Sequence, residues 1–154
     1  MNFGREYEQA IDALRTARVL DPTIGEIQYW LAYACLRRAR FAEAIAGLHA
    51  LPEGAFSAAK WASLGEAHAL AGDKAAAHDA LQKLDSLAAN GFVSPSCRVC
   101  VYAGLGEWDR VFKVLEQAPL YPAPWLSLAK VDPRYDPIRS DRRFQDLLAR
   151  MHLL

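Results

Sequence analysis

Two cysteines three residues apart, Cys97 and Cys100, form the motif in the chain that most clearly suggests a chemical role. On a helix this spacing places both thiols on one face, where they could share a metal ion or form a redox pair. No second pair of ligands at zinc-site spacing accompanies them, and no thioredoxin-type strand and helix pattern surrounds them. We therefore interpret both as small apolar residues packed between helices. With Cys35 the chain has three cysteines, too few for a disulfide scaffold, so reduced thiols are expected.

The other polar candidates do not combine into a catalytic or metal-binding pattern. Glu66 and His68 are two residues apart and therefore fall on different faces of a helix. The glycine pair at 104 and 106 follows no predicted strand, which argues against a phosphate-binding loop. The chain has four histidines, none at the i, i+4 spacing of helical metal ligands: His49, His68, His78 and His152. Because no nucleophile, base and orienting group come together, the sequence predicts no enzyme, no metal and no cofactor.

Length and charge restrict the class of protein further. The 154 residues suffice for one domain or a short array of repeats, given about 150 residues per domain. Lys+Arg and Asp+Glu both number 18, so no overall charge attracts nucleic acid or anionic lipid. The longest apolar run, Tyr29 to Leu36, is far shorter than the ~18 residues of a membrane span, and the first residues lack a signal peptide's apolar stretch. We expect a cytoplasmic protein without nucleic-acid or membrane partners.

Small and apolar residues recur along the chain at a nearly constant interval. One column steps by 34, 33 and 34 residues through Ala10, Ala44, Ala77 and Val111. A second column, four residues later, contains Leu14, Leu48, Leu81 and Leu115. An aromatic column three residues before the first contains Tyr7, Phe41 and Trp108, with Lys74 at the third copy. A period of this length predicts stacked units, none of which buries its apolar face alone.

Each unit has the pattern of a helical hairpin. Its apolar residues follow i, i+3, i+4, i+7 spacing, which is typical of one helix face and not of a strand. In the third unit, Gly72 can close the first helix in the left-handed conformation, and Asp73 can cap the second. Gly65 is expected where the two helices of that unit cross closely. Similar breaks at 38–40 and 105–107 predict hairpins in the neighbouring units, and hence an all-α protein.

The third unit resembles the tetratricopeptide repeat. The resemblance consists of Trp61-x-x-Leu64-Gly65 followed by Ala77-x-x-x-Leu81, and the second copy keeps Leu31-Ala32 with Ala44 and Leu48. It implies a right-handed superhelical solenoid over residues 1–118, with a half repeat at 3–22 and repeats at 24–52, 57–90 and 93–118. The sequence departs from the family pattern at Gln28, His68, Lys74 and Val99.

After residue 118 the period ends, and prolines predict a connector over 119–139. A last helix is expected over 140–154, capped by Ser140 or Asp141, with an apolar face of Phe144, Leu147, Leu148 and Met151. This end resembles the closing segment that follows tetratricopeptide repeats in bacterial signalling proteins, including winged-helix regulators, Ser/Thr kinases and adenylyl cyclases.

By the geometry that the resemblance implies, the first helix of each unit lines a concave groove. Its expected outward residues are Glu26, Tyr29, Tyr33, Leu36 and Arg37, then Ala59, Ala62, Glu66 and Leu70, then Ser96, Cys100 and Ala103. Tyrosines that are not needed for packing between helices often anchor a binding partner. The alternative is that Tyr29 and Tyr33 pack against the preceding helix.

Arg37, Arg38 and Arg40 form a basic cluster, interpreted either as a solvated turn or as a contact for an acidic group. Ala62 and Glu66 replace the Lys and Asn with which some family members clamp a C-terminal carboxylate.

The resulting expectation is a non-catalytic module that binds a protein or peptide, as a regulatory or scaffold segment in bacterial signalling. Two alternatives stay open. The stripe of residues 3–20 begins inside a repeat, which predicts either a homodimer through this helix or a longer natural protein. A helical-repeat RNA binder has nearly the same period, although the neutral charge argues against it.

Overall fold

A computed structural model describes residues 3–52, 54, 56–117 and 129–151, and every regular element within these ranges is helical. The elements are α1 (Phe3–Leu20), α2 (Gly25–Arg37), α3 (Phe41–His49), α4 (Ser57–Leu70), α5 (Lys74–Asn90), α6 (Pro95–Leu105), α7 (Trp108–Gln117), the 3-10 helix η2 (Pro133–Ile138) and α8 (Arg142–Arg150). The predicted all-α class is confirmed. Across the described ranges, no helix has both the length and the apolar character needed to cross a membrane.

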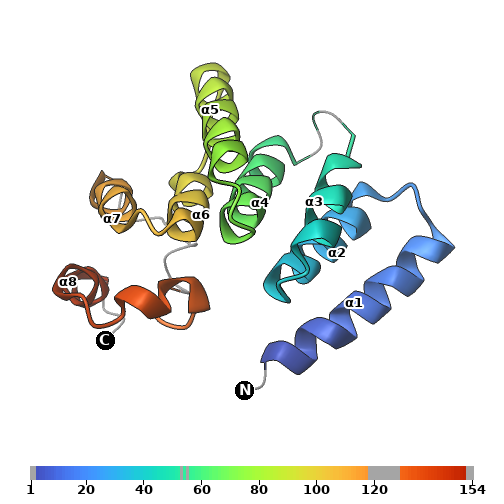
Figure 1. Ribbon diagram of the computed structural model, residues 1–154, viewed down its shortest axis with the longest axis horizontal. Helices are drawn as coiled ribbons and strands as arrows, with labels where there is room; N and C mark the ends of the chain where they lie inside the picture. Colours follow the sequence, from blue (N-terminus) through green and yellow to red (C-terminus); the bar gives the residue numbers. More distant parts are fainter. Residues whose placement is uncertain (1–2, 53, 55, 118–128, 152–154) are drawn as a thin grey trace.

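The helices form an arc, shown in Figure 1. Consecutive helices pack together as α2 with α3, α4 with α5, and α6 with α7, and α4 also packs along α6. The arc runs from α1 to α7, and η2 and α8 then lie beneath α6 and α7, so that α1 and the C-terminal elements face each other across its open side. Residues 119–128 of the expected connector lie outside the described residues.

The helix ends follow the local signals in the sequence. The Asp73 carboxylate accepts a hydrogen bond from the amide of Ala76 at 3.0 Å and so caps α5. Gly72 and Gly106 have φ values of 91° and 73°, the left-handed conformation that ends a helix without steric cost. Of the two candidate caps for α8, it is Asp141 whose carboxylate accepts from the amide of Arg143, at 2.9 Å.

The repeat columns lie mainly in the core. Ala32, Ala44, Leu48, Leu64, Ala77, Leu81 and Leu115 are buried, whereas Ala10, Leu14, Trp61 and Trp108 are half-buried. Ile11 follows Ala10 of the first column directly, and it is the fully buried residue through which α1 contacts α2 and α3. At the other end of α1, Val19 and Leu20 are exposed. The first helix thus buries one side chain deeply and leaves its apolar stripe partly open.

Gly65 permits a close approach between helices, although its nearest neighbour differs from the expected one. A Cβ atom added there would lie 2.6 Å from Cγ2 of Val101 on α6 and 3.0 Å from Cβ of Ala80 on α5. The tightest crossing is therefore between α4 and α6, in successive units, and not within the third unit alone. The periodicity places Gly65 on a packed face but does not say which helix approaches it.

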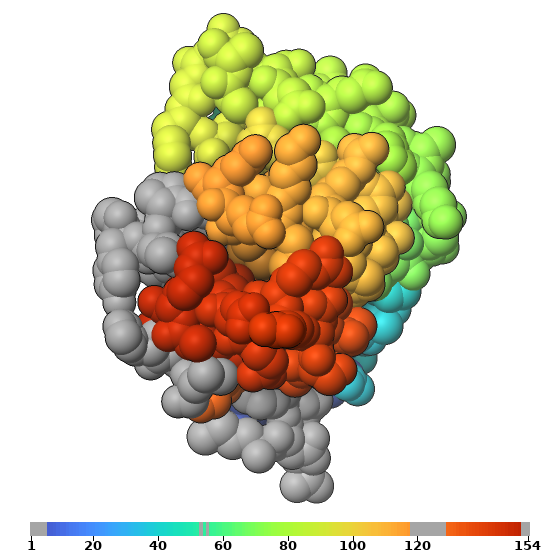
Figure 2. Space-filling model, turned by 90° about the vertical axis from the view of Figure 1, so that its left-hand side faces the viewer, coloured from blue at the N-terminus to red at the C-terminus, as the bar shows by residue number. Residues whose placement is uncertain are grey.

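The last helix covers the end of the arc. Phe144, Leu147 and Leu148 are buried against side chains of α7 and η2, including Phe112, Leu115, Tyr135 and Ile138. Figure 2 shows the surface of α8 and η2 lying directly beneath that of α7. The helix spans Arg142–Arg150 within the expected range of 140–154, of which residues 152–154 lie outside the described residues.

Candidate functional site

Four aromatic rings gather at the inner side of α2, and we call them the aromatic cluster: Tyr29, Trp30, Tyr33 and Phe56. Tyr29 stacks on Phe56 with ring centroids 5.0 Å apart, and Trp30 meets Tyr29 and Tyr33 edge-on at 5.2 and 5.9 Å. Tyr29 is only 8% exposed, whereas Trp30 is 51% exposed. The cluster therefore has a fixed base and one large aromatic side chain held open to solvent.

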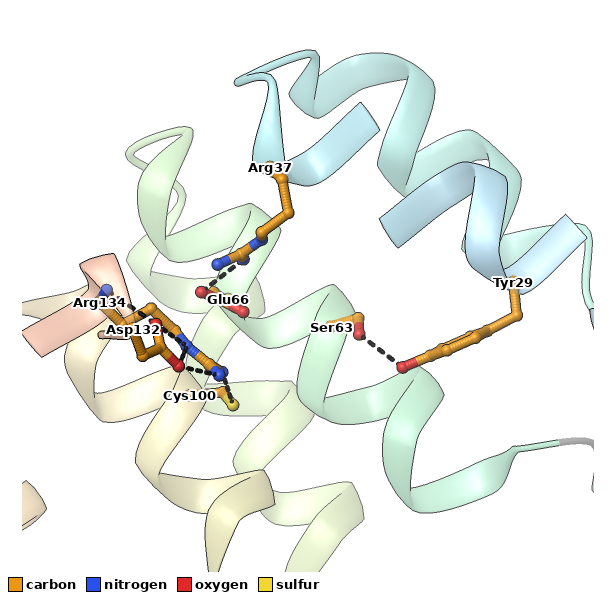
Figure 3. Close-up of polar contacts among 7 residues, drawn as sticks. All are labelled: Tyr29, Arg37, Ser63, Glu66, Cys100, Asp132 and Arg134. Atoms are coloured by element: carbon orange, nitrogen blue, oxygen red, sulfur yellow. Dashed lines mark hydrogen bonds and ion pairs between the residues drawn. The ribbon is translucent and has the colours of Figure 1, made fainter. Parts of the chain in front are cut away.

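Tyr29 packs toward the next hairpin, against Leu64 of α4. The hydroxyl groups of Tyr29 and Ser63 on α4 are 3.4 Å apart, close enough for a hydrogen bond (Figure 3). Burial raises the pKa of Tyr29 and that of Tyr33, so both phenols stay neutral at physiological pH. Phe56, which supports Tyr29, has a φ of 53°, an uncommon backbone conformation for a residue other than glycine.

Arg37 of α2 and Glu66 of α4 form an ion pair inside the arc. Their side chains are 10% and 3% exposed, and Arg37 Nη2 lies 2.6 Å from Glu66 Oε1. The guanidinium carbon also lies 5.1 Å from the centroid of the Tyr33 ring, within the range of a cation–π contact. Burial alone lowers the pKa of Arg37, but Glu66 outweighs it and leaves the pKa raised, so the group is charged. Within the described structure, Arg37 Nε has no hydrogen-bond acceptor.

The C-terminal segment adds a second arginine to this region. Arg134 of η2 donates from Nε to the Asp132 carboxylate at 2.9 Å and from Nη1 to the sulfur of Cys100 on α6 (Figure 3). Burial raises the pKa of the Cys100 thiol to about 12, even though Arg134 opposes the shift. For Asp132, burial raises the pKa, but the bonds from Arg134 outweigh it and leave the pKa lowered. At neutral pH, Cys100 is a thiol and Asp132 a carboxylate.

Two cavities meet at Glu66 and Arg134, which line both. The aromatic cavity, of 260 Å³, lies beside Trp30 and is lined by Tyr29, Trp30, Tyr33, Ala59, Ala62, Ser63, Glu66, Ser96, Cys97, Cys100, Arg134 and Tyr135. The arginine cavity, of 480 Å³, is lined by Tyr7, Leu36, Arg37, Arg38, Ala39, Phe41, Glu66, Leu70, Ala103, Gly104, Trp108, Pro133, Arg134 and Pro137. Because α2, α4 and α6 supply residues to both, the inner side of the arc is a hollowed surface with two compartments.

A wider opening of 750 Å³ lies between the turn before α7 and the start of α8. Its charged residues pair with one another: Arg143 reaches Asp109 and Asp141, each at 2.9 Å, and Arg110 reaches Glu107 at 3.1 Å. With its charges already matched, this opening is a weaker candidate for ligand binding than the inner side of the arc.

The structure brings most of the expected groove residues together. Tyr29, Tyr33, Ala59, Ala62, Glu66, Ser96 and Cys100 line the aromatic cavity, and Leu36, Arg37, Glu66, Leu70 and Ala103 line the arginine cavity. Glu26 lines neither. Leu36 and Glu66 are buried and do not project outward, because Leu36 packs in the core and Glu66 meets Arg37.

Three residues of the site were not expected from the sequence: Trp30, Phe56 and Arg134. Trp30 adjoins an expected groove residue, and its size alone was a usable signal. Phe56 precedes a helix in a turn, and Arg134 comes from another element far along the chain. The repeat pattern therefore does not predict that Phe56 or Arg134 belongs to the site.

The candidates for metal or nucleophilic chemistry do not converge. Cys97 and Cys100 both line the aromatic cavity, and burial raises the pKa of each thiol, which disfavours the reactive thiolate. Over the described ranges, His, Cys, Asp and Glu side chains form no group of three or more that could hold a metal ion. The ring of half-buried His68 lies 3.6 Å from the carboxylate of Asp73 and 6.4 Å from the ring of His49.

No protein-family model, curated protein or solved structure matches the chain. The resemblance to tetratricopeptide repeats therefore rests on the residues of the chain itself.

Proposed function

We propose that the chain is a non-catalytic module of tetratricopeptide-like hairpins, wound as a right-handed superhelix, that binds a protein or peptide on its inner side. The observation that carries this proposal is the half-exposed Trp30. Contact energy in protein interfaces concentrates in a few aromatic and arginine side chains that are held rigidly beside a pocket. Trp30 meets that description, since two tyrosines buttress it and a cavity opens next to it.

The C-terminal segment limits where such a partner binds. Tyr135 is buried, and Arg134 lies against Cys100, so η2 covers part of the inner face of α6. Among the residues that the structure describes, the part of the inner surface that η2 leaves uncovered is formed by α2 and α4. We therefore place the partner's anchor, a bulky apolar side chain, in the aromatic cavity next to Trp30. By the resemblance, the setting is bacterial signalling in the cytoplasm.

The test uses peptide libraries selected on the full chain, with the affinities of recovered peptides measured by calorimetry. Trp30→Ala is expected to weaken binding at least tenfold while lowering the unfolding midpoint only modestly, because about half of the side chain is exposed. Phe92→Ala is the matched control, since Phe92 is 90% exposed but lines neither inner cavity. Peptides that bind Trp30→Ala as well as the parent would contradict the proposal. Binding of mixed RNA oligonucleotides with strong salt dependence would favour a helical-repeat RNA binder instead.

Self-association is a second candidate, favoured by one observation. Val19 and Leu20 are each 82% exposed at the end of α1, next to a partly open apolar stripe. Exposed apolar surface of this kind often forms an interface. Sedimentation velocity over a concentration series tests it: a dimer should form in the parent chain and be lost in Leu20→Lys. A monomer at every concentration would exclude this candidate.

A further inference from the structure

The arginine cavity is a recess whose wall is built by many elements. Five helices each contribute a large apolar side chain to its wall: Tyr7 of α1, Leu36 of α2, Phe41 of α3, Leu70 of α4 and Trp108 of α7. On the C-terminal side, Pro133 and Pro137 of η2 complete the wall. Its volume of 480 Å³ falls within the range of about 300–1,000 Å³ that is typical of small-molecule sites. A compact molecule therefore fits this recess in size.

The charged groups on the wall are mainly positive. Three arginines, Arg37, Arg38 and Arg134, line the cavity together with one carboxylate, that of Glu66. Arg38 pairs with a glutamate at 2.7 Å and Arg134 with an aspartate, but neither of these two acidic residues lines the cavity. The surface that a ligand meets therefore carries more guanidinium than carboxylate groups. Such a wall attracts an anion and disfavours a cation.

Arg37 is the group best placed to bind that anion. Its side chain is nine-tenths buried, its only ionic partner within the described structure is Glu66, and its Nε has no acceptor. A buried N–H without an acceptor costs free energy, and an oxygen atom of a ligand recovers that cost once the guanidinium group turns toward the cavity. The planar guanidinium group also matches the two oxygens of a carboxylate in geometry.

We propose that the arginine cavity binds a small organic acid, with its carboxylate at Arg37 and its apolar body between Leu70 and Trp108. The charge-assisted hydrogen bonds gain strength because the Arg37 side chain is only 10% exposed to solvent. The apolar walls favour an aromatic or medium-chain body over a sugar or a multiply charged phosphate, whose polar groups would lose hydration without replacement. This site adjoins the aromatic cavity at Glu66 and Arg134 but takes a different ligand, so it goes beyond the proposed binding of a protein or peptide.

The probes are three acids: phenylacetate, indole-3-acetate and octanoate. Phenylacetamide and phenethylamine are the controls for phenylacetate, because they resemble it in size but are neutral and cationic. Binding to the full chain is measured by ligand-observed NMR and by calorimetry. We expect phenylacetate to bind at least tenfold more tightly than phenylacetamide, and phenethylamine not to bind. Equal binding of the acid and the amide, preference for the amine, or no binding by any of the three acids would each overturn the proposal.

Three variants locate the site. Arg37→Lys keeps a positive charge opposite Glu66 but removes the Nε–H group, and it should weaken acid binding about tenfold. Leu70→Trp enlarges a partly exposed side chain at the wall, and it should abolish binding by filling the cavity without disturbing the core. Trp30→Ala alters only the aromatic cavity, so acid binding should be unchanged.

The outcomes for Leu70→Trp and Trp30→Ala separate this proposal from the proposed function. If acids bind Leu70→Trp normally or fail to bind Trp30→Ala, they occupy another site and the inference is wrong, whatever the peptide libraries show. If Arg37→Lys binds acids as the parent does while remaining folded by circular dichroism, the assigned role of Arg37 is wrong.

Discussion

Arg37 Nη2 of α2 lies 2.6 Å from Glu66 Oε1 of α4, and both side chains are nearly withdrawn from solvent. This ion pair joins two successive hairpins, and both of its residues line the arginine cavity. Its contribution to the free energy of unfolding should therefore differ from that of the exposed ion pairs.

Removing one member of this pair should be costly. Glu66→Met leaves the guanidinium group buried without its counter-ion and is expected to lower the free energy of unfolding by about 3–5 kcal/mol. The double variant Arg37→Met/Glu66→Met should recover most of that loss, because no buried charge remains. Urea unfolding of both variants checks this. The exposed pair of Arg15 and Glu43, at 2.8 Å, is the control, and Glu43→Ala should cost about 1 kcal/mol or less. A small effect of Glu66→Met would mean that water reaches the pair.

The crossing of α4 and α6 should not tolerate a single methyl group at Gly65. Gly65→Ala would place Cβ 2.6 Å from Val101 Cγ2, and we expect a loss of about 1–3 kcal/mol from overpacking, offset in part by the better helix propensity of alanine. In the Val101→Ala background the same substitution should cost much less. Gly25→Ala provides the control, since a Cβ atom there would meet nothing within 4 Å. A midpoint in urea that is equal for Gly65→Ala and the parent would contradict the close crossing.

The last helix should contribute to stability chiefly through Phe144. This side chain is fully buried beside Tyr135, with ring centroids 5.3 Å apart. Phe144→Ala should lower the free energy of unfolding by about 3–5 kcal/mol, and truncation before Ser140 should cause aggregation in a sedimentation experiment. Phe92→Ala, at an exposed position, should change little. A truncated chain that stays monomeric and equally stable would show that α8 is not needed as a cover.

Stability should fall at alkaline pH through Cys100. Its pKa rises from the ordinary value of 9.0 to about 12 in the folded chain because of burial. Below pH 9 the thiol is protonated in both states, whereas between pH 9 and 12 only the unfolded chain loses the proton. The free energy of unfolding therefore decreases as pH rises through that window. Cys100→Ala should show a shallower decrease than the parent in urea unfolding between pH 8.5 and 10.5. Parallel curves would mean that the thiol is not protected from ionising.

The helices and their order could be predicted because their signals are local. Asp73 caps α5, Gly106 ends α6, and α1 and α2 begin and end within a few residues of the expected limits. Each of these features depends on residues within one turn of the helix end.

The inner surface could not be predicted to the same extent. Periodicity indicates which face of a helix is buried, but it does not indicate which distant segment approaches that face. Arg134 reaches Cys100 from another element, and Val101 is nearer than Ala80 to Gly65. The sequence predicts that Glu66 points outward, but its side chain is buried. The reason is its ion pair with Arg37, which comes from the preceding hairpin and which no repeat pattern indicates.

The arginine cavity has Tyr7 of α1 on one wall and Pro137 of η2 on another, near opposite ends of the chain. The spacing of these walls depends on the small rotation at every helix interface between them, and such rotations accumulate along an array. The width of this cavity should therefore respond to small changes at each of those interfaces. A molecule held between the two walls would stiffen the whole arc, including hairpins that it never touches.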